Sequence, residues 1–407
     1  MSGGVVIVGA GQAGARTALE LRALGYEGRI TLIGDEPYPP YERPNLSKEM
    51  ISDVQTKVSW VSGEKDYADA EINIFLATRV ERIDRAKQSI FLNDGTTCDY
   101  EYLVLATGGR PRQLPFVSSR ICTLRTVDDA LRIRDLAAKA RKVIVVGAGV
   151  IGLEVASTLC AMGIETTVVE QGPGILGRGF PSNLAAYLAD LHQVAGIRIL
   201  TSVGIGAVRD ADAELSVELG TGETLTCDFA VVGIGITPNV SLAEKAGLSI
   251  DNGIIVDSQL RTSDIKIYAV GDNAIKRDEN GRLCRVETWQ NANLTATAAA
   301  ASITGRPRRV PDVPWFWTDQ LGHNIQLAGK FDEFTTSYER YGVNEGSKVF
   351  LYLKRDILVG AATVDAGREM SLCRRLIQAC KRIEPELLEP ARLDMAALQA
   401  ALKVSLV

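Results

Sequence analysis

The hydrophobic pattern of the chain contains the same unit twice, at residues 5–25 and 143–163. Each copy begins with a β-branched apolar run, passes through glycines spaced G-x-G-x-x-G, and continues into an amphipathic stretch that stops at a further glycine. Another strand-like run follows, at residues 30–33 and 166–169. This order predicts strand, glycine turn, helix and strand, the beginning of a parallel βαβ unit. Two units so far apart in the chain predict two nucleotide-binding domains rather than one long sheet.

Other apolar runs complete the predicted sheets. A run at residues 89–92 precedes Asn-Asp-Gly, which is typical of a hairpin turn. The alanine-rich segment 295–301 predicts a helix with no role beyond packing. Three further strand-like runs end at a glycine: residues 102–106, 229–232 and 267–270.

The pattern changes after a proline-rich bend at residues 306–314. Two runs, 349–353 and 357–364, predict antiparallel strands around a short turn, and residues 371–381 predict a helix. No glycine fingerprint occurs in this part of the sequence. The fold class predicted for the whole chain is therefore α/β, with two Rossmann-like domains followed by a C-terminal α+β domain.

Composition and charge exclude several function classes. The chain has 407 residues, of which 46% are hydrophobic and 23% charged, as expected for a folded protein. Its net charge of −5 makes it a poor candidate for binding nucleic acid. The N-terminus lacks a signal-peptide pattern, and no run of apolar residues is long enough to cross a membrane. We therefore expect a cytoplasmic protein that binds neither nucleic acid nor membrane.

Cysteine and histidine usage narrows the chemistry further. The 7 cysteines are scattered and contain no C-x-x-C, which argues against a zinc ribbon or a thioredoxin-type pair and fits a reducing compartment. There are only 2 histidines, His192 and His323, so we expect no metal site.

The glycine fingerprints predict where dinucleotides bind. The first glycine makes a tight turn, the second lets the backbone approach a pyrophosphate, and the third lets helix and strand pack closely. An acid at the end of the second strand should bind the ribose hydroxyls, and in the second copy this is Glu170. Gln171 follows it rather than an arginine, which favours NAD(H), although Arg178 lies close enough to leave NADP(H) open. In the first copy Asp35 and Glu36 are the candidates.

Glu170 itself aligns best with Gly34 once a two-residue insertion in the first copy is allowed. The sequence therefore leaves open which acid of the first copy binds a ribose.

Several motifs together resemble a known family. Both fingerprints, Ala-Thr-Gly at 106–108, Gly-Ile-Gly at 233–235 and Gly-Asp at 271–272 occur in the order found in flavoproteins with two dinucleotide-binding domains. Three blocks narrow the match: PYERPNLSK at 40–48, VETWQNA at 286–292 and PWFWTDQ at 314–320. With them the chain resembles the FAD-dependent NADH:ferredoxin reductases of bacterial oxygenase and cytochrome P450 systems, the family of putidaredoxin reductase and biphenyl dioxygenase ferredoxin reductase.

The resemblance implies a glutathione-reductase-like arrangement. The FAD-binding domain comprises residues 1–112 and 244–314 and is interrupted by an NAD-binding domain at 113–243, and residues 315–407 form the C-terminal domain. Implied FAD contacts are Gly9, Gly11, Gly14, Asp35, Glu36, Arg43, Lys48, Ala106, Thr107, Gly108, Gly271, Asp272, Thr288, Trp289 and Trp317. Implied NADH contacts are Gly147, Gly149, Val150, Ile151, Gly152, Glu154, Glu170, Gly233, Ile234, Gly235 and Glu287.

The resemblance also implies catalytic roles for Lys48, Glu154 and Trp317. Reduction leaves negative charge on a flavin, so a cation beside it is useful, and Lys48 is the candidate. A buried lysine without a partner tends to lose its proton, so a paired acid such as Glu154 is physically sensible. Trp317 is expected to stack near the flavin and the nicotinamide. The plain alternatives are a solvated lysine, an acid that favours the helix dipole and a core aromatic ring.

The positions of the cysteines distinguish between activities of related flavoproteins. Residues 36–60 contain no cysteine, which argues against disulfide reduction, so electrons should pass singly to an external [2Fe–2S] ferredoxin. The alternatives are a rubredoxin reductase, an NADH oxidase, or a nucleotide-responsive interaction protein resembling apoptosis-inducing factor. We expect the chain to be a monomer or a weak homodimer. Because a ferredoxin of this kind is acidic, the chain needs a basic patch on its surface to dock it. Candidate patch residues are Arg306, Arg308, Arg309, Arg374, Arg375, Lys381 and Arg382.

Overall fold

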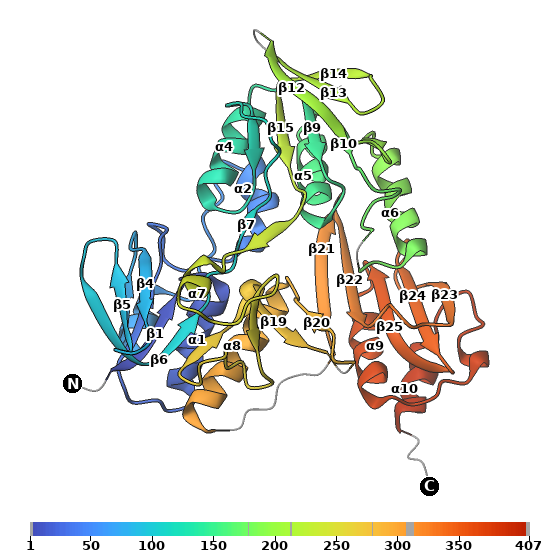
Figure 1. The fold of residues 1–407 in the computed structure, drawn as a ribbon. Coiled ribbons are helices and arrows are strands. Elements are labelled where there is room, and N and C mark those ends of the chain that lie inside the picture. Colours follow the sequence, from blue (N-terminus) through green and yellow to red (C-terminus); the bar gives the residue numbers. More distant parts are fainter. Residues whose placement is uncertain (1–2, 178, 212–213, 279, 307–312, 404–407) are drawn as a thin grey trace. The chain divides into compact units, whose positions relative to one another are not determined.

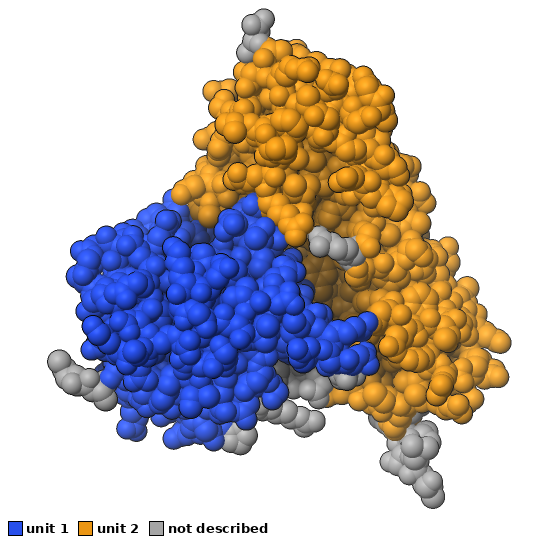
Figure 2. All heavy atoms as spheres, in the orientation of Figure 1, with its two compact units in different colours: residues 1–45, 57–111, 236–311 blue, residues 46–56, 112–235, 312–407 orange. Residues whose placement is uncertain are grey.

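The computed structural model describes residues 3–177, 179–211, 214–278, 280–306 and 313–403 (Figure 1). These residues form two compact units, coloured separately in Figure 2. Unit 1 comprises residues 1–45, 57–111 and 236–311, and unit 2 comprises residues 46–56, 112–235 and 312–407. The predicted three-domain boundaries stay a prediction. Arg178, Arg308 and Arg309 lie outside the described residues.

Unit 1 is built on a sheet with parallel strands at its centre. The order is β3 (Ile72–Phe75), β2 (Ile30–Ile33), β1 (Gly4–Val8) and β6 (Thr97–Leu105), and β18 (Ile267–Ala269) also pairs with β6. The antiparallel strands β5 (Ser89–Leu92) and β4 (Val80–Asp84) continue from the first part of β6. Every residue of β1 and β2 is buried, which explains why these strands are almost entirely apolar, with Thr31 as the one polar residue, rather than alternating.

The helices of unit 1 cover this sheet. Helix α1 (Gln12–Ala23) packs on α8 (Trp289–Thr304). Helix α8 is longer than the predicted 295–301, because the Thr288 hydroxyl accepts a hydrogen bond from the Asn291 amide and starts the helix earlier. The remaining elements are α3 (Glu64–Asp69), α7 (Ser241–Lys245), η1 (Arg43–Ser47, which continues into unit 2), η2 (Gly271–Asn273), β7 (Gly109–Pro111), β16 (Ile236–Pro238), β17 (Ile254–Val256), β19 (Ala274–Arg277) and β20 (Leu283–Cys284).

Unit 2 contains a second parallel sheet. Its order is β11 (Arg198–Leu200), β10 (Glu165–Val169), β9 (Lys142–Val146), β15 (Phe229–Val232) and β8 (Ile121–Thr123), with every pair parallel. The accompanying helices are α2 (Glu49–Ser52), α4 (Val127–Ala137), α5 (Val150–Ala161) and α6 (Ser182–Val194). An antiparallel sheet is formed by β12 (Ile205–Ala211), β13 (Glu214–Leu219) and β14 (Thr224–Cys227).

The C-terminal part of unit 2 is an antiparallel sheet with helices. The order is β21 (Trp315–Gln320), β22 (His323–Gly329), β25 (Ile357–Val364), β24 (Lys348–Lys354) and β23 (Thr336–Tyr341). Helix α9 (Gly367–Ala379) starts before the predicted residue 371 and packs on β25, and η3 (Pro385–Leu387) and α10 (Met395–Lys403) follow. One hydrophobic cluster includes Leu153 of α5, Ile325 of β22 and Phe350 of β24. The second nucleotide fold therefore shares a core with this sheet.

The predicted fold class is confirmed: two α/β sheets built on parallel strands and a C-terminal α+β part. Both repeated units form strand, glycine turn, helix and strand, and each helix stops just before a glycine with a positive φ, +75° at Gly25 and +83° at Gly163. Among the described residues, no helix has both the length and the apolar character needed to cross a membrane.

Candidate functional site

The first glycine turn lies between β1 and α1. Gly9 has a φ of +110°, and a Cβ there would lie 2.2 Å from the carbonyl oxygen of Ala106. A Cβ at Gly14 would lie 1.9 Å from the carbonyl oxygen of Gly9. At Gly11, by contrast, the nearest atom to an added Cβ is 3.8 Å away. The turn and the packing thus require the first and third glycines, whereas the second preserves open space.

The second glycine turn, between β9 and α5, has the same geometry. Gly147 has a φ of +101°, and a Cβ there would lie 2.6 Å from the carbonyl oxygen of Gly233. A Cβ at Gly152 would lie 2.0 Å from the carbonyl oxygen of Gly147, whereas at Gly149 the nearest atom is 3.9 Å away. The middle glycine of this turn also has no packing function.

Both turns present a helix N-terminus that suits a phosphate. The N-cap residues are Gly11 for α1 and Gly149 for α5, neither of which supplies a side-chain cap, and neither helix has an acid in its first turn. The first amide groups of such a helix have no intrahelical acceptor and carry partial positive charge. Together with the open space at the middle glycine, this arrangement fits the pyrophosphate of a dinucleotide at each turn.

The residues after the second strand differ between the copies. Ile33 pairs with Val8 and Val169 pairs with Val146, so Gly34 and Glu170 occupy equivalent positions. The Glu170 carboxylate accepts hydrogen bonds from the backbone amides of Ala148 at 2.7 Å and Gly172 at 2.6 Å. This places an acid directly against the second glycine turn.

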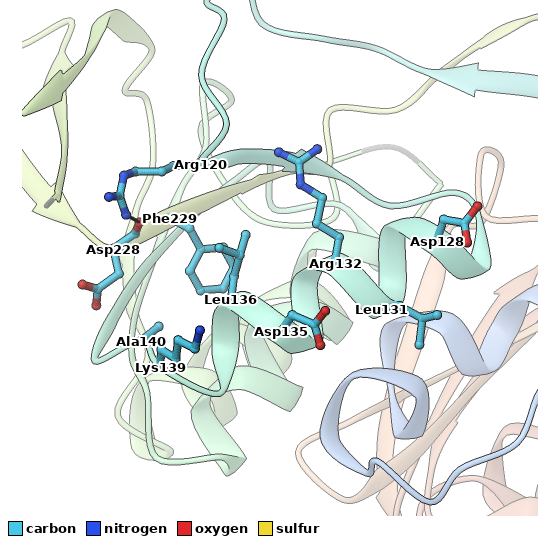
Figure 3. Close-up of a pocket in the computed structure, with 10 residues that line it drawn as sticks. All are labelled: Arg120, Asp128, Leu131, Arg132, Asp135, Leu136, Lys139, Ala140, Asp228 and Phe229. Carbon is cyan, nitrogen blue, oxygen red and sulfur yellow. Dashed lines mark hydrogen bonds between the residues drawn. The ribbon is translucent and has the colours of Figure 1, made fainter.

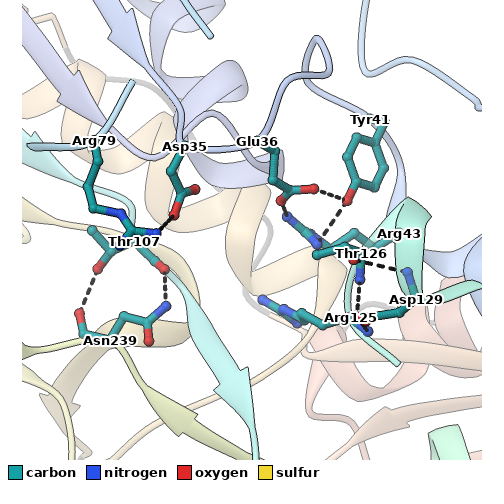
Figure 4. A network of polar contacts seen from close by, with 10 residues as sticks. All are labelled: Asp35, Glu36, Tyr41, Arg43, Arg79, Thr107, Arg125, Thr126, Asp129 and Asn239. Atoms are coloured by element: carbon teal, nitrogen blue, oxygen red, sulfur yellow. Dashed lines mark hydrogen bonds and ion pairs between the residues drawn. The ribbon is translucent and has the colours of Figure 1, made fainter. Parts of the chain in front are cut away.

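In the first copy the two candidate acids have different partners (Figure 4). The Asp35 side chain is 62% exposed and lies 3.7 Å from Arg79. Glu36 accepts hydrogen bonds from the Arg43 guanidinium at 2.7 Å and from the Tyr41 hydroxyl at 2.5 Å. Burial alone lowers the pKa of Arg43, but Tyr41 and Glu36 outweigh it and the pKa is raised. Arg43 is thus a fixed cation beside Gly11.

A second polar cluster of unit 1 joins three of its loops. The Thr107 hydroxyl donates to the backbone carbonyl of Asn239 at 2.7 Å, and the Asn239 amide donates to the Thr107 carbonyl at 2.9 Å (Figure 4). The side chain of Asn273, in η2, donates to the Thr107 hydroxyl at 2.9 Å. The predicted segments Ala106–Gly108 and Gly271–Asp272 are therefore brought together.

The N-terminal end of α8 is hydrogen-bonded to the 40–48 block. The Trp289 indole N–H donates to the Glu42 carboxylate at 2.5 Å. Burial raises the pKa of Glu42, and the hydrogen bonds from Trp289 and Gln12 oppose this rise. Thr288 caps α8, and Glu287 pairs with Arg285 at 2.5 Å.

In unit 2, Lys48 lies between two carboxylates. Its Nζ is 3.4 Å from Glu154 of α5 and 3.4 Å from Asp319 of β21. The Lys48 side chain is 13% exposed and that of Glu154 only 5%, whereas Asp319 is 41% exposed. Glu154 also accepts hydrogen bonds from the hydroxyls of Ser47 at 2.5 Å and Thr318 at 2.6 Å. Lys48 and Glu154, predicted to pair, are brought together at a nearly closed charged site.

Trp317 lies on the same strand as Asp319. Its ring stacks on Trp315, with ring centroids 5.1 Å apart and planes inclined by 20°. The Arg374 guanidinium lies 5.4 Å from the centroid of the Trp315 ring. Because side chains alternate along a strand, the two tryptophans and Asp319 share one face of β21.

The remaining predicted NADH residues surround the second glycine turn. A Cβ on Gly233 would lie 3.2 Å from the Gly152 amide, and Gly235 has a φ of +96°. Val150 and Ile151 form the first turn of α5, and Ile151 is 45% exposed. Glu287 belongs to unit 1 rather than to this group.

Several polar residues of these clusters were not predicted from the sequence: Tyr41, Ser47, Asn239, Asn273, Thr318 and Asp319. Tyr41, Ser47, Thr318 and Asp319 belong to the quoted 40–48 and 314–320 blocks, which was a usable signal. Asn239 and Asn273 follow Gly-Ile-Gly and Gly-Asp, but their partner Thr107 is remote in sequence, so local pattern carried no sign of them.

A cavity of about 650 Å³ lies elsewhere in unit 2, beside α4 (Figure 3). Charged side chains of both signs line it, among them Arg120, Arg132 and Asp135. None of the predicted site residues contributes to its lining. This cavity therefore contains none of the residues that the sequence singles out.

Comparison with known proteins agrees with these features. Residues 3–296 match the model of the pyridine nucleotide-disulphide oxidoreductase family, and residues 315–399 match the reductase C-terminal family. The 3-phenylpropionate/cinnamic acid dioxygenase ferredoxin–NAD(+) reductase component of Photorhabdus laumondii is 39% identical over 377 residues, which cover 91% of this chain and 95% of that protein.

Solved structures give the same result. The ferredoxin reductase for the CYP199A2 system from Rhodopseudomonas palustris has a TM-score of 0.90 at 37% identity and covers 98% of this chain and 99% of its own. Putidaredoxin reductase, in its covalent complex with putidaredoxin, has a TM-score of 0.91 at 33% identity, with 99% of each chain covered. The chain therefore belongs to the pyridine nucleotide-disulphide oxidoreductase family and carries the reductase C-terminal domain.

Proposed function

We propose that this chain is an FAD-dependent NADH:ferredoxin oxidoreductase that supplies electrons to an oxygenase or a cytochrome P450. One NADH would reduce two [2Fe–2S] ferredoxins and release one proton. The observation that carries the proposal is the pair of glycine turns, each with an uncapped helix N-terminus and a middle glycine that packing does not require. The relatives whose names specify ferredoxin reduction support the choice of electron acceptor.

FAD is assigned to unit 1. The pyrophosphate would lie at the α1 N-terminus, where Arg43 supplies a fixed positive charge. Ala106–Gly108, Gly271 and Asp272 would line the rest of the site, with Thr288 and Trp289 contributing from the start of α8. Asp35 and Glu36 remain the candidate ribose ligands; the engagement of Glu36 with Arg43 favours Asp35 for a direct contact.

NADH is assigned to the second turn, at Gly147, Gly149 and Gly152. Glu170 would bind the adenosine ribose hydroxyls, since its carboxylate already lies against this turn. Val150, Ile151 and Gly233–Gly235 would border the coenzyme, and Glu287 would accept from the carboxamide.

Hydride acceptance and the release of single electrons are the chemistry that FAD would supply. In this chain Lys48 would provide the cation, Glu154 would hold it in place, and Trp317 would stack beside the reacting rings. Asp319, at 3.4 Å from Lys48, joins this group as a second acid.

Ferredoxin docking is assigned to the basic residues near the C-terminal part of unit 2. Arg374 and Arg375 lie on α9, and Lys381 and Arg382 follow that helix. Arg306, an exposed residue of unit 1, is a separate candidate, and the candidates Arg308 and Arg309 lie outside the described residues. Docking through charge predicts that ferredoxin reduction slows as salt rises while ferricyanide reduction does not, and equal flat salt profiles would remove this assignment. We also propose a cytoplasmic protein that is a monomer or a weak homodimer.

Stopped-flow absorbance tests the function directly. NADH should bleach the flavin of the purified holoenzyme under anaerobic conditions, and subsequent mixing with an oxidised [2Fe–2S] ferredoxin should restore the absorbance. Rapid consumption of O₂ without a carrier would instead indicate an NADH oxidase. Slow bleaching with a persistent charge-transfer band would indicate a nucleotide-responsive interaction protein.

A further inference from the structure

The buried carboxylate of Glu154 has a complete set of donors. Ser47 donates to Oε2 at 2.5 Å, Thr318 donates to Oε1 at 2.6 Å, and Lys48 Nζ lies 3.4 Å from Oε1. An ionised carboxylate buried this deeply requires such donors. One of these donors, Thr318, is itself hydrogen-bonded to a further buried side chain.

Thr318 is connected to His192 through Gln320. The Gln320 amide nitrogen donates to the Thr318 hydroxyl oxygen at 3.0 Å, and the Gln320 amide oxygen lies 2.8 Å from His192 Nε2. His192, Gln320 and Thr318 are all buried, and β21 places Thr318 and Gln320 on the same face. A hydroxyl has one hydrogen, and the Gln320 amide already fills an acceptor position of Thr318. The Thr318 hydrogen is therefore directed to Glu154.

The tautomer of His192 and the direction of these hydrogen bonds depend on each other. His192 is 1% exposed, and Nδ1 is buried with no hydrogen-bond partner among the described residues. Burial lowers the pKa of His192, against the opposing hydrogen bond with Gln320, so the ring is neutral near pH 7. Since the Gln320 oxygen only accepts, the single ring hydrogen belongs on Nε2.

The opposite direction would deprive Glu154 of a donor. With the hydrogen on Nδ1, Nε2 would accept, the Gln320 amide would turn over, and its oxygen would face Thr318. Thr318 would then donate to Gln320 instead of Glu154. The neutral tautomer of one buried histidine thus decides how the carboxylate beside Lys48 is held.

We infer that His192 and Gln320 are positioning residues that act through the Thr318 hydroxyl to orient Glu154 beside Lys48. This inference rests on the proposed role of the Lys48–Glu154 pair in hydride transfer from NADH. His192 acts at a distance, since it touches Gln320 rather than Glu154.

A set of variants tests the order of action. Thr318→Val removes the hydroxyl at nearly constant shape and should slow flavin bleaching by NADH about tenfold, the cost of one hydrogen bond to a charged group. His192→Leu should slow it by a smaller factor. In the double variant the His192→Leu change should have no further effect, because its route to Glu154 is already removed. Thr318→Ser, which keeps the hydroxyl, should retain most of the wild-type rate.

Thr363 offers a matched control. It is a fully buried threonine of the same sheet whose hydroxyl has no hydrogen-bond partner among the described residues. Thr363→Val should leave the bleaching rate unchanged. The FAD content and unfolding temperature of every variant check that the fold is intact. Independent slowing by Thr318→Val and His192→Leu, multiplying in the double variant, would overturn the inference.

A spectroscopic measurement does not depend on activity. The chain has only 2 histidines, so ¹⁵N-histidine labelling gives two sets of ring signals, and His323→Gln identifies those of His192. We expect the holoenzyme to show His192 as the Nε2–H tautomer at pH 8. The Nδ1–H pattern would overturn the inference. A wild-type enzyme that NADH does not reduce, but whose His192 shows the Nε2–H pattern, would reject the proposed function alone.

Discussion

The two glycine turns have nearly the same backbone geometry, but the residues next to them differ. Gly9 and Gly147 have φ angles of +110° and +101°, and a Cβ on Gly14 or Gly152 would lie 1.9 or 2.0 Å from the carbonyl oxygen of the first glycine. The two copies differ at the first residue after the second strand. In the second copy the Glu170 carboxylate accepts a hydrogen bond from the Ala148 amide. In the first copy the equivalent residue is Gly34, where an added Cβ would lie 2.5 Å from the Cβ of Ala10. The glycines thus specify the turn, and the next residues specify what it holds.

The largest effect is expected at the third glycines. Gly14→Ala and Gly152→Ala each force a methyl group into a backbone carbonyl, which should destabilise the affected unit by about 3 kcal/mol or more. Thermal unfolding of the holoenzyme measures this loss. Gly174→Ala is the matched control, since nothing lies within 4 Å of a Cβ there and its φ is not positive. Unchanged unfolding temperatures for Gly14→Ala and Gly152→Ala would contradict the packing role.

The middle glycines should separate the two cofactors. An added Cβ at Gly11 or Gly149 meets no atom closer than 3.8 Å, so both variants should fold normally. The methyl group would instead obstruct the pyrophosphate, and a clash of this size weakens binding roughly 10- to 100-fold. We expect Gly11→Ala to lose FAD on purification, and Gly149→Ala to keep its FAD but show a raised KM for NADH. Equal loss of FAD in both variants would contradict the assignment of one cofactor to each turn.

The same comparison shows what sequence predicts. The strands next to the glycines, the positive φ at Gly9 and Gly147 and the open middle positions follow from local spacing, because a turn of this kind has few solutions. The alternation of β21 likewise predicts that Trp317 and Asp319 share a face.

Contacts between remote segments did not follow from the sequence. The ion pair of Lys48 with Asp319 and the hydrogen bond of His192 with Gln320 depend on how α6, β21 and residues 46–56 pack together. The pairing of Lys48 with Glu154 was expected from family resemblance rather than from spacing, for the same reason. Local propensity carries no information on which face of β21 meets α5.

A smaller effect is expected at Glu170, the residue that differs from its counterpart Gly34. Glu170→Ala removes the carboxylate at the second turn and should raise the KM for NADH about tenfold, with kcat nearly unchanged. Asp35→Ala should have a smaller effect on FAD binding than Glu170→Ala has on NADH binding, since the Asp35 side chain is exposed and pairs with Arg79. Replacing Glu170-Gln171 by Ser-Arg should favour NADPH, because a cation then faces the 2′-phosphate. If the wild-type enzyme already uses NADPH as well as NADH, Glu170 does not select the coenzyme.

The smallest effect concerns the segments that follow the second strand in each copy. Unit 1 buries Tyr67 of α3 there, and burial raises the pKa of its phenol further from neutrality. Unit 2 buries His192 of α6, whose pKa is lowered by burial from the ordinary value of 6.5. Between the lowered pKa of folded His192 and the ordinary value of 6.5, the unfolded chain binds a proton at His192 that the folded chain does not. Unit 2 therefore loses stability as the pH falls through this range.

This contribution of His192 to stability is full above pH 6.5 and decreases as the pH drops towards and through the lowered pKa. His192→Gln removes the titrating group and keeps a donor for Gln320. The unfolding temperature of the wild type should therefore fall relative to that of this variant between pH 7 and pH 5. A difference in unfolding temperature that does not change with pH would show that His192 titrates alike in the folded and unfolded chains. Tyr67→Phe, the matching change in unit 1, should give a difference that does not vary over the same range, because neither its phenol nor its replacement titrates there.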